Sequence, residues 1–133
     1  MARFVIDPPT LLHLVDRDVV AHPAHQLVAP NSIRSDAMQL LLQDVRRGQR
    51  TAKDALATHD RMTGVKIRLL GDRVSRGLAW RIAIDQGWET LRDAEYAAIT
   101  RLQADAFVTI DARLAAKVAT VVRVAPLEVL IAA

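Results

Sequence analysis

Short apolar runs alternate with longer segments of helical periodicity along this chain. The runs at residues 2–6 (ARFVI), 65–70 (VKIRLL), 106–110 (AFVTI) and 121–125 (VVRVA) predict strands, and residues 26–29 predict a further extended stretch. Between them, helices are expected to begin near Pro8, Asn31 or Ser32, Thr51, Asp72, Asp93 and Asp111. Apolar strands separated by helices are typical of a parallel sheet that is covered on both faces. The pattern therefore predicts an α/β fold: a three-layer α/β/α sandwich around a parallel sheet of about five strands.

Composition narrows the class of protein. A length of 133 residues with 51% hydrophobic and 25% charged residues predicts a single globular domain, residues 1–133. Because the chain has no cysteine, disulfides, thiolate zinc sites and cysteine nucleophiles are excluded. No apolar run approaches the ~18 residues of a membrane span, and MARFVIDPP lacks the pattern of a signal peptide. We therefore expect a cytoplasmic protein that makes no use of a membrane.

The charge balance weakly favours a polyanionic partner. The chain has a formal net charge of +3 and a sequence pI near 9.9, and basic surface attracts phosphate backbones. A basic run crosses the predicted junction between the second and third helices, and its members are candidate RNA contacts: Arg46, Arg47, Arg50 and Lys53. For any single residue of this run, a solvated helix face is the favoured interpretation.

Aspartates recur where predicted strands give way to helices. Asp7 follows residues 2–6, Asp111 follows residues 106–110, Asp93 opens a helix, and Asp36 lies about one turn inside another helix. Because parallel strands place their carboxyl ends at one edge, these side chains are expected to converge there. Clustered carboxylates repel one another unless a cation neutralises them, and Mg²⁺ or Mn²⁺ prefers oxygen ligands. Such an ion polarises a phosphoryl oxygen and activates water for attack on phosphorus. The competing interpretation is that Asp7, Asp93 and Asp111 are helix N-caps and that Asp36 lies on a solvated face.

Motifs along most of the chain resemble those of a known family. Residues 93–114 (DAEYAAITRLQADAFVTIDARL) combine Asp-Ala-x-Tyr, a helix, an apolar strand and Thr-x-Asp-x-x-Leu. VIDPPTLLHLV, APNSIRSDAMQLLL and RRGQRTAKDALA add a strand-end acid, a proline-to-acid helix entry and the following turn and helix. With these motifs the chain resembles the PIN-domain family, in particular the small ribonucleases that act as toxins of bacterial VapBC-type toxin–antitoxin pairs.

The resemblance implies a Mg²⁺- or Mn²⁺-dependent endoribonuclease in which metal-activated water cleaves RNA, possible targets being tRNA or rRNA. Carried over by position, the metal-binding and catalytic acids are Asp7, Asp36, Asp93 and Asp111, with the Thr109 hydroxyl supporting the last. A small cognate antitoxin and a homodimer are the implied protein partners. Thus the strand at residues 106–110 is expected to end on Thr-x-Asp because that acid is directed at a cation.

Two positions depart from the family pattern. Pro9 stands where a small hydroxyl residue usually follows the first acid, and Thr10, one position later, is the hydroxyl left to support that acid. Asp36 stands where a glutamate is usual. These departures keep open a second hypothesis, a catalytically weakened relative that acts as a protein- or RNA-binding module. A third is a receiver-type phospho-acceptor domain, which would carry a lysine at the end of its last strand, where this chain offers only Arg123.

Overall fold

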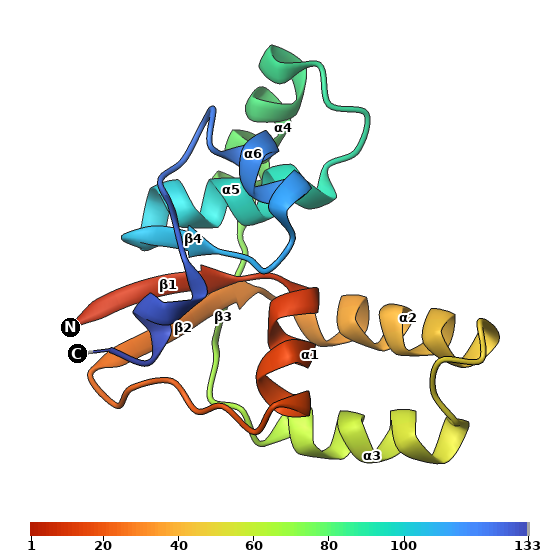
Figure 1. The fold of residues 1–133 in the computed structure, drawn as a ribbon. Coiled ribbons are helices and arrows are strands. Elements are labelled where there is room, and N and C mark those ends of the chain that lie inside the picture. Colours follow the sequence, from red (N-terminus) through yellow and green to blue (C-terminus); the bar gives the residue numbers. More distant parts are fainter. Residues whose placement is uncertain (133) are drawn as a thin grey trace.

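The computed structural model describes residues 1–132 and has a five-stranded, all-parallel sheet (Figure 1). Its strands are β1 (Ala2–Ile6), β2 (His25–Pro30), β3 (Arg68–Leu70), β4 (Ala106–Val108) and β5 (Val124–Ala125), in the order β3-β2-β1-β4-β5. In the register, Phe4 of β1 lies opposite Leu27 of β2, and Val5 lies opposite Phe107 of β4. The α/β class and the parallel sheet predicted from the sequence are confirmed.

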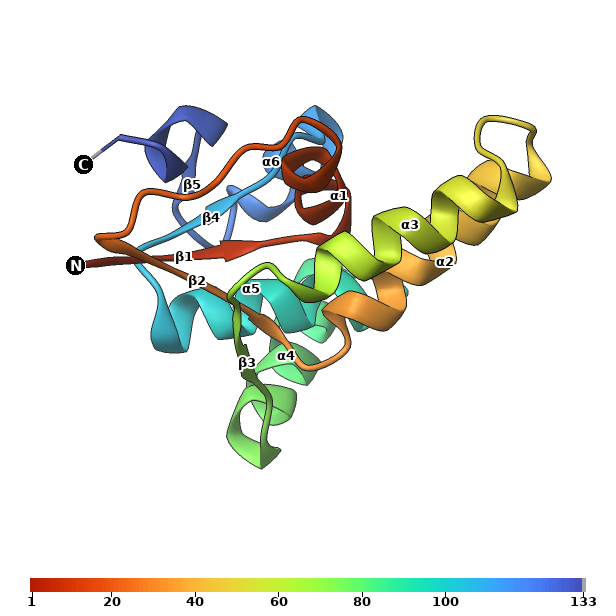
Figure 2. The same ribbon diagram turned by 90° about the horizontal axis from the view of Figure 1, so that it is seen from below.

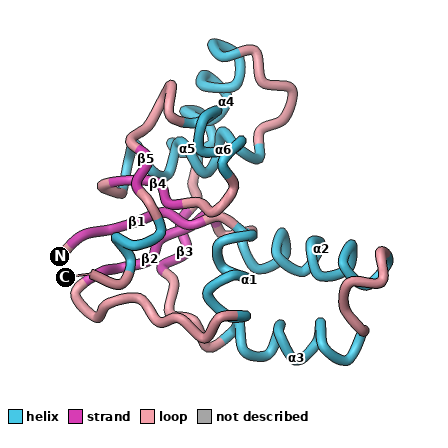
Figure 3. Tube along the Cα trace, viewed as in Figure 1, coloured by secondary structure: helices cyan, strands magenta, loops and turns pink. Residues whose placement is uncertain are grey.

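Helices cover both faces of this sheet. They are α1 (Pro8–Asp16), α2 (Ile33–Arg46), α3 (Ala52–Thr63), α4 (Arg73–Gln86), α5 (Arg92–Gln103) and α6 (Ala112–Val118), followed by the short 3₁₀ helix η1 (Leu127–Leu130). Figure 2 shows α1 and α6 on one side of the strands and α5 with α4 on the other, which is the predicted three-layer arrangement. The α2–α3 pair extends away from the sheet as a long helical hairpin (Figure 3). No helix among residues 1–132 is long and apolar enough to cross a lipid bilayer.

Local sequence signals set most of the helix ends. Pro8 and Pro9 occupy the first turn of α1, where backbone amides have no helical acceptor. Thr51 caps α3 by accepting a hydrogen bond from the Asp54 amide. Gly87 ends α4 with a φ of 69°, a left-handed conformation that glycine adopts without steric cost.

The central strand β1 and its neighbour β4 carry residues with no exposure to solvent. Val5, Ile6, Phe107 and Val108 have no measurable exposure, and α5 packs across β1, β2 and β4 with Ala94, Ala97 and Ala98 fully buried. Small side chains on α5 let this helix lie close to the sheet. A core built mainly from Ala, Val, Leu and Ile, with Phe107 as its largest fully buried side chain, suits a chain that is poor in aromatic residues.

Three expected strands are shorter than the apolar pattern predicts. β3 covers residues 68–70 instead of 65–70, and the Val65 carbonyl accepts a hydrogen bond from the Arg34 guanidinium. β4 ends at Val108 instead of residue 110, because the Ile110 amide donates to the Thr10 hydroxyl. β5 is reduced to residues 124–125, because the amides of residues 121 and 122 donate to the Val118 carbonyl and prolong the end of α6. In each case the apolar pattern correctly indicates buried residues, whereas hydrogen bonds to side chains or within turns determine where pairing between the strands ends.

The chain reverses its direction across the sheet between β1 and β4. From β1 it proceeds through β2 to β3 at one edge, and it then returns to place β4 on the other side of β1. In open parallel sheets, ligands bind beyond the carboxyl ends of the strands at such a switch point. Asp7 immediately follows β1, and Asp111 lies three residues after the end of β4. The fold therefore brings both acids to the place where a binding site is expected.

Candidate metal and phosphate site

Four helices begin at the carboxyl edge of the sheet and carry the predicted acids there. Asp7 and Asp111 are the N-cap residues of α1 and α6. Asp36 and Asp93 lie in the first turns of α2 and α5. A helix N-terminus presents unpaired amides and a partial positive charge, which stabilises nearby carboxylates. The fold thus places all four acids at one end of the molecule, each in a different local environment.

Asp7 is the most deeply buried of these acids. Its side chain is 1% exposed, and its Oδ1 accepts a hydrogen bond from the Thr10 amide at 3.2 Å. Burial raises the pKa of the Asp7 carboxyl above its ordinary value, and hydrogen bonds from Thr10 and Thr109 oppose that rise. The capping interpretation of Asp7 is therefore correct for one carboxylate oxygen, while the second oxygen has another partner.

Thr109 connects Asp7 to Asp111. Its hydroxyl donates to Asp7 Oδ2 at 2.6 Å and accepts a hydrogen bond from the Asp111 amide at 3.0 Å. The Asp111 carboxylate itself caps α6, accepting from the amides of Arg113 at 2.9 Å and Leu114 at 3.2 Å. Thr109 was expected to support Asp111, but its side chain holds the Asp7 carboxylate and touches Asp111 only through the backbone. The two acids are thereby coupled through one hydroxyl.

Thr10 also supports this corner of the site, although its hydroxyl does so indirectly. The side chain is fully buried, and its Oγ1 accepts from the Ile110 amide at 3.0 Å. This bond ties the first turn of α1 to the segment that carries Thr109 and Asp111. Pro9, which lies beside it in the first turn of α1, leaves the supporting contacts of Asp7 to Thr10 and Thr109.

Asp36 is held by side chains from its own helix and from α5. Its Oδ2 accepts hydrogen bonds from the Ser32 hydroxyl at 3.1 Å and from the Tyr96 hydroxyl at 3.2 Å. Its Oδ1 lies 3.9 Å from Nε of Arg92. Burial, followed by the negative charge of Asp36, raises the pKa of Tyr96, and the charge of Asp7 adds to the effect. Asn31 or Ser32 was predicted to cap α2, and Ser32 is the N-cap residue, but its hydroxyl bonds Asp36 and makes no capping hydrogen bond.

Asp93 is paired with a lysine that the sequence did not single out. The helix begins at Arg92 with Leu91 as its N-cap residue, so Asp93 is not the cap that its position suggested. Lys117 Nζ donates to Asp93 Oδ2 at 2.8 Å. The same ammonium lies 4.7 Å from the centre of the Trp88 ring. Lys117 comes from α6 and Asp93 from α5, so this pair links the two helices across the site.

Asp93 and Asp111 open into a shared pocket. The pocket measures about 450 Å³ and is lined by Asp93, Asp111, Arg113, Leu114 and Lys117. Two carboxylates and two cationic side chains therefore face the same small volume. Carboxylate oxygens can hold a hard divalent cation, while arginine and lysine can contact a phosphate beside it.

Whether these residues fit Mg²⁺ depends on how many carboxylates reach one ion. Among residues 1–132, no group of three or more His, Cys, Asp or Glu side chains is arranged to hold a metal. The expected four-acid metal site is thus not assembled in this arrangement, because each acid is already bonded to another group of the protein. Mg²⁺, however, often binds through one or two carboxylates and keeps several waters. The all-oxygen pair Asp93 and Asp111 fits that requirement, with Asp7 and Asp36 behind it in the hydrogen-bonded network.

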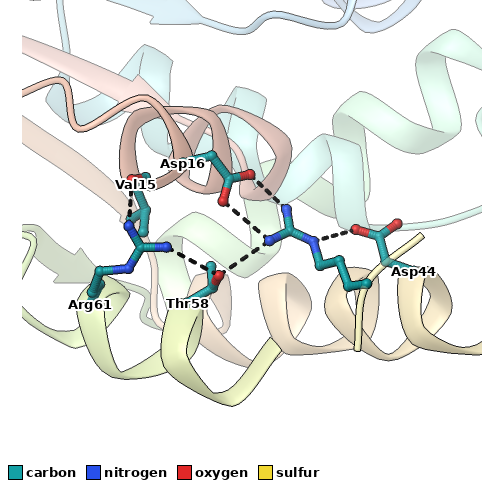
Figure 4. Close-up of polar contacts among 6 residues, drawn as sticks. Val15, Asp16, Asp44, Thr58 and Arg61 are labelled. Atoms are coloured by element: carbon teal, nitrogen blue, oxygen red, sulfur yellow. Dashed lines mark hydrogen bonds and ion pairs between the residues drawn. The ribbon is translucent and has the colours of Figure 1, made fainter. Parts of the chain in front are cut away.

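The predicted RNA-binding run has two different environments. Arg50 is engaged inside the protein: its guanidinium bonds Asp16 at 2.6 Å and Asp44 at 2.9 Å, and it also reaches Thr58 (Figure 4). This residue therefore ties α1, α2 and α3 together, and the prediction that it contacts phosphate is disfavoured by its geometry. The other members of the run, Arg46, Arg47 and Lys53, are exposed near the tip of the α2–α3 hairpin. At 1.5 Å per helical residue, Arg47 lies roughly 16 Å along the helix axis from Asp36. These residues are therefore outside the pocket and could contact only a more distant part of a bound RNA.

Several contributors were missed by sequence reasoning. Tyr96 has a recognisable signal, because it lies three residues after Asp93 and thus on a neighbouring face of the same helix. Arg113 has a local signal as well, because it lies two residues after Asp111 in the first turn of α6. Lys117 and Trp88 have no fixed spacing that relates them to Asp93. They meet it only because α6 and the α4–α5 connection pack against the start of α5.

A larger cavity lies at the opposite edge of the sheet. It measures about 930 Å³ and is lined mainly by apolar side chains from the α1–β2 and α3–β3 connections. None of the predicted site residues borders it. The smaller pocket is the candidate site, because two of the predicted acids, Asp93 and Asp111, line it together with Arg113 and Lys117.

Comparison with known proteins supports the fold. No protein-family model matches the chain, and no curated protein sequence matches it. Among solved structures, the chain is similar to the crystal structure of PAE2754 from Pyrobaculum aerophilum, with a TM-score of 0.69 and 20% sequence identity. The match covers 97% of this chain and 93% of that protein. The likeness extends over the whole fold: an α/β sandwich built on a five-stranded parallel sheet.

Proposed function

We propose that this protein is a Mg²⁺- or Mn²⁺-dependent endoribonuclease of the PIN-domain type, the toxin of a VapBC-like toxin–antitoxin pair. The observation that carries the proposal is the pocket shared by Asp93 and Asp111 at the switch point of the sheet. Asp7 is coupled to Asp111 through Thr109, and Asp36 joins through Tyr96. Four acids at one edge suit cleavage by a metal-activated water, which requires no histidine, lysine or serine nucleophile.

Each acid has a distinct role in this proposal. Asp93 and Asp111 would hold the ion directly, because their carboxylates face the pocket. When bound, the ion supplies a water of lowered pKa and polarises the scissile phosphate. Buried Asp7 orients the Thr109 hydroxyl and hence the Asp111 backbone. Asp36, held by Tyr96, contributes negative charge near the pocket without lining it. Arg113 and Lys117 supply positive charge for the phosphate.

The proposal is tested by RNA cleavage with a matched set of variants. Purified protein is incubated with end-labelled tRNA or rRNA fragments in Mg²⁺ buffer and in the same buffer with a chelator. Wild type is expected to cleave only with Mg²⁺, and Asp93→Asn and Asp111→Asn are expected to lose at least ~100-fold in rate, because each removes a metal-facing carboxylate. The control is Asp60→Asn, since the Asp60 side chain is 86% exposed on α3, away from the pocket.

The same variants distinguish the protein's own activity from that of contaminating ribonucleases. Cleavage that survives in Asp93→Asn and Asp111→Asn at the wild-type rate would refute the assignment. A rate lost equally in Asp60→Asn would point to damage of the fold. Calorimetric titration with Mn²⁺ provides a readout that does not depend on the choice of RNA.

The proposed partners are RNA, a small cognate antitoxin and a second copy of the chain, within the cytoplasm. Basic residues around the site and at the hairpin tip support the RNA partner. On the outer face of α4, Val74, Trp80 and Ile84 are exposed apolar side chains. Exposed apolar groups of this size on one helix support a protein partner there.

A second candidate function is a protein- or RNA-binding module without catalysis. It is favoured by one observation: within residues 1–132 every predicted acid already has an internal partner, and no three acids are placed to share a metal. Such a module would retain RNA or protein binding but would take up no Mn²⁺ in calorimetry. Mn²⁺ uptake that is lost in Asp93→Asn would exclude this candidate.

A further inference from the structure

Lys117 occupies a cation site that the protein builds from its own side chains. Its ammonium lies between the Asp93 carboxylate, at 2.8 Å, and the face of the Trp88 ring, at 4.7 Å from the centroid. A carboxylate on one side and an aromatic face on the other both attract positive charge. The side chains of Lys117 and Asp93 are 37% and 29% exposed, so the pair is partly shielded from solvent. Nothing in the sequence pattern that identifies the acids accounts for this arrangement.

The position of the ammonium conflicts with a divalent ion. Asp93 lines the shared pocket, and one of its two carboxylate oxygens, Oδ2, is already bonded to Lys117. A doubly charged ion held by the Asp93 carboxylate would lie within a few ångströms of the ammonium that bonds the same carboxylate at 2.8 Å. In a water-like medium, a dication and an ammonium at such a separation repel strongly enough to weaken binding on the order of tenfold. Breaking the contact with Trp88 adds to the cost of moving the lysine.

We propose that Lys117 is a resident counter-cation of the Asp93–Asp111 pocket, which a divalent metal must displace from Asp93 before the site is competent. This inference rests on the proposed metal-dependent function and adds its regulation: the lysine sets the metal concentration at which the site fills. In the metal-free protein it neutralises Asp93 and holds α6 against α5. Once displaced, the ammonium remains in the same pocket, where the phosphate of an RNA substrate is its next available anionic partner.

The first test measures metal affinity without any catalytic readout. Mn²⁺ is titrated calorimetrically into wild type, Lys117→Met, Lys117→Arg and the control Lys53→Met. Methionine keeps the unbranched apolar stem against Trp88 and removes the charge, so its Kd for Mn²⁺ is expected to fall about tenfold. Arginine keeps the charge and should bind Mn²⁺ as wild type does. Lys53 is exposed on α3, so Lys53→Met should also match wild type.

A second test uses the unaltered lysine and follows Trp88 directly. The chain has two tryptophans, and Trp80→Phe removes the exposed one on α4, which leaves Trp88 as the only tryptophan reporter. Displacement of the ammonium from its ring should change the emission of Trp88 during a Mg²⁺ titration. The change should follow the calorimetric binding curve, and it should be absent in the double variant with Lys117→Met.

The outcomes separate this inference from the function on which it rests. Metal binding by wild type with equal or weaker binding by Lys117→Met overturns the counter-cation role and leaves the nuclease proposal standing. Metal binding without any change in Trp88 emission has the same consequence, because the lysine has then not moved. If neither wild type nor Lys117→Met binds Mn²⁺ at millimolar concentration, the metal site itself fails, and this inference fails with it.

Discussion

The hydrogen bond from the Thr109 hydroxyl stabilises the buried Asp7 carboxylate, and its contribution to the free energy of unfolding can be measured. Thr109→Val keeps the shape of the side chain but removes the donor that lies 2.6 Å from Asp7 Oδ2. The carboxylate is 1% exposed, so water cannot replace the lost bond. A hydrogen bond to a charged buried group contributes ~1.5–3 kcal/mol, and we expect Thr109→Val to lower the free energy of unfolding by about 2 kcal/mol. For a chain of this length, that corresponds to a melting temperature lower by roughly 7 °C.

The stability lost in Thr109→Val should depend on the charge of Asp7, and this dependence can be measured in two ways. Burial raises the pKa of Asp7 in the folded state, and the Thr109 bond partly offsets that rise. Removing the bond raises this pKa further, so the folded variant binds its proton more tightly than wild type does. The variant is therefore penalised most at neutral pH, and the penalty shrinks as the pH falls through the raised folded-state pKa values of the variant and of wild type, both of which lie above the ~3.9 of an unperturbed aspartate. Denaturant unfolding at pH 7.5 and at about pH 4 measures this difference.

A double-mutant cycle supplies the second measurement. In the Asp7→Asn background the carboxylate is absent, and Thr109→Val should cost only ~1 kcal/mol, the value of a neutral hydrogen bond. The reasoning is refuted if Thr109→Val costs the same in both backgrounds and at both pH values. Thr109 would then act through packing, and its contact with Asp7 would contribute nothing measurable.

Three further substitutions, one of them with a matched control, test separate parts of the structure. Asp7→Asn should abolish RNA cleavage and yet raise the free energy of unfolding at pH 7.5 by about 1 kcal/mol, because a neutral side chain avoids the burial of charge; the gain, followed by thermal melting, should fade as the pH is lowered and the wild-type carboxyl protonates. Tyr96→Phe removes the 3.2 Å bond to Asp36 and should weaken Mn²⁺ binding roughly tenfold in calorimetry; an unchanged Kd would show that Asp36 takes no part in the site. Arg50→Met should lower the free energy of unfolding by ~1–2 kcal/mol, because its side chain is 19% exposed and joins three helices, while RNA affinity in a filter-binding assay stays unchanged. Arg47→Met, at an exposed position, should weaken RNA binding and leave the free energy of unfolding unchanged. A loss of RNA affinity with Arg50→Met alone would contradict the structural role of Arg50.

Much of the candidate site was accessible from local sequence signals. Asp7 and Asp111 each follow an apolar run and open a helix, so their placement at the carboxyl edge followed from the rule for parallel strands. Asp36 stood out because an acid inside a helix has no capping role there. The error at Asp93 was local as well: Leu91 and Arg92 precede it in helical conformation, and a one- or two-residue shift of a helix start is within ordinary uncertainty.

The partners of these acids were not accessible in the same way. Thr109 and Asp7 are 102 residues apart in the chain, Tyr96 and Asp36 are 60 apart, and Lys117 and Asp93 are 24 apart. No spacing rule relates such pairs, because their meeting depends on strand order and on how α5 and α6 pack. The bond between Arg50 and Asp16, 34 residues apart, is of the same kind. The basic run is visible in the sequence, whereas this acid partner belongs to α1.

The amino-acid sequence alone specified the elements, the parallel character of the sheet and the edge at which the acids gather. These features depend on hydrophobic period, capping and chirality, which act over a few residues. The tertiary structure decided the strand order, the early ends of β3, β4 and β5, and above all which donor satisfies each acid. Those choices depend on side chains brought together across the fold, where a buried carboxylate bonds whichever hydroxyl or cation the packing places within reach.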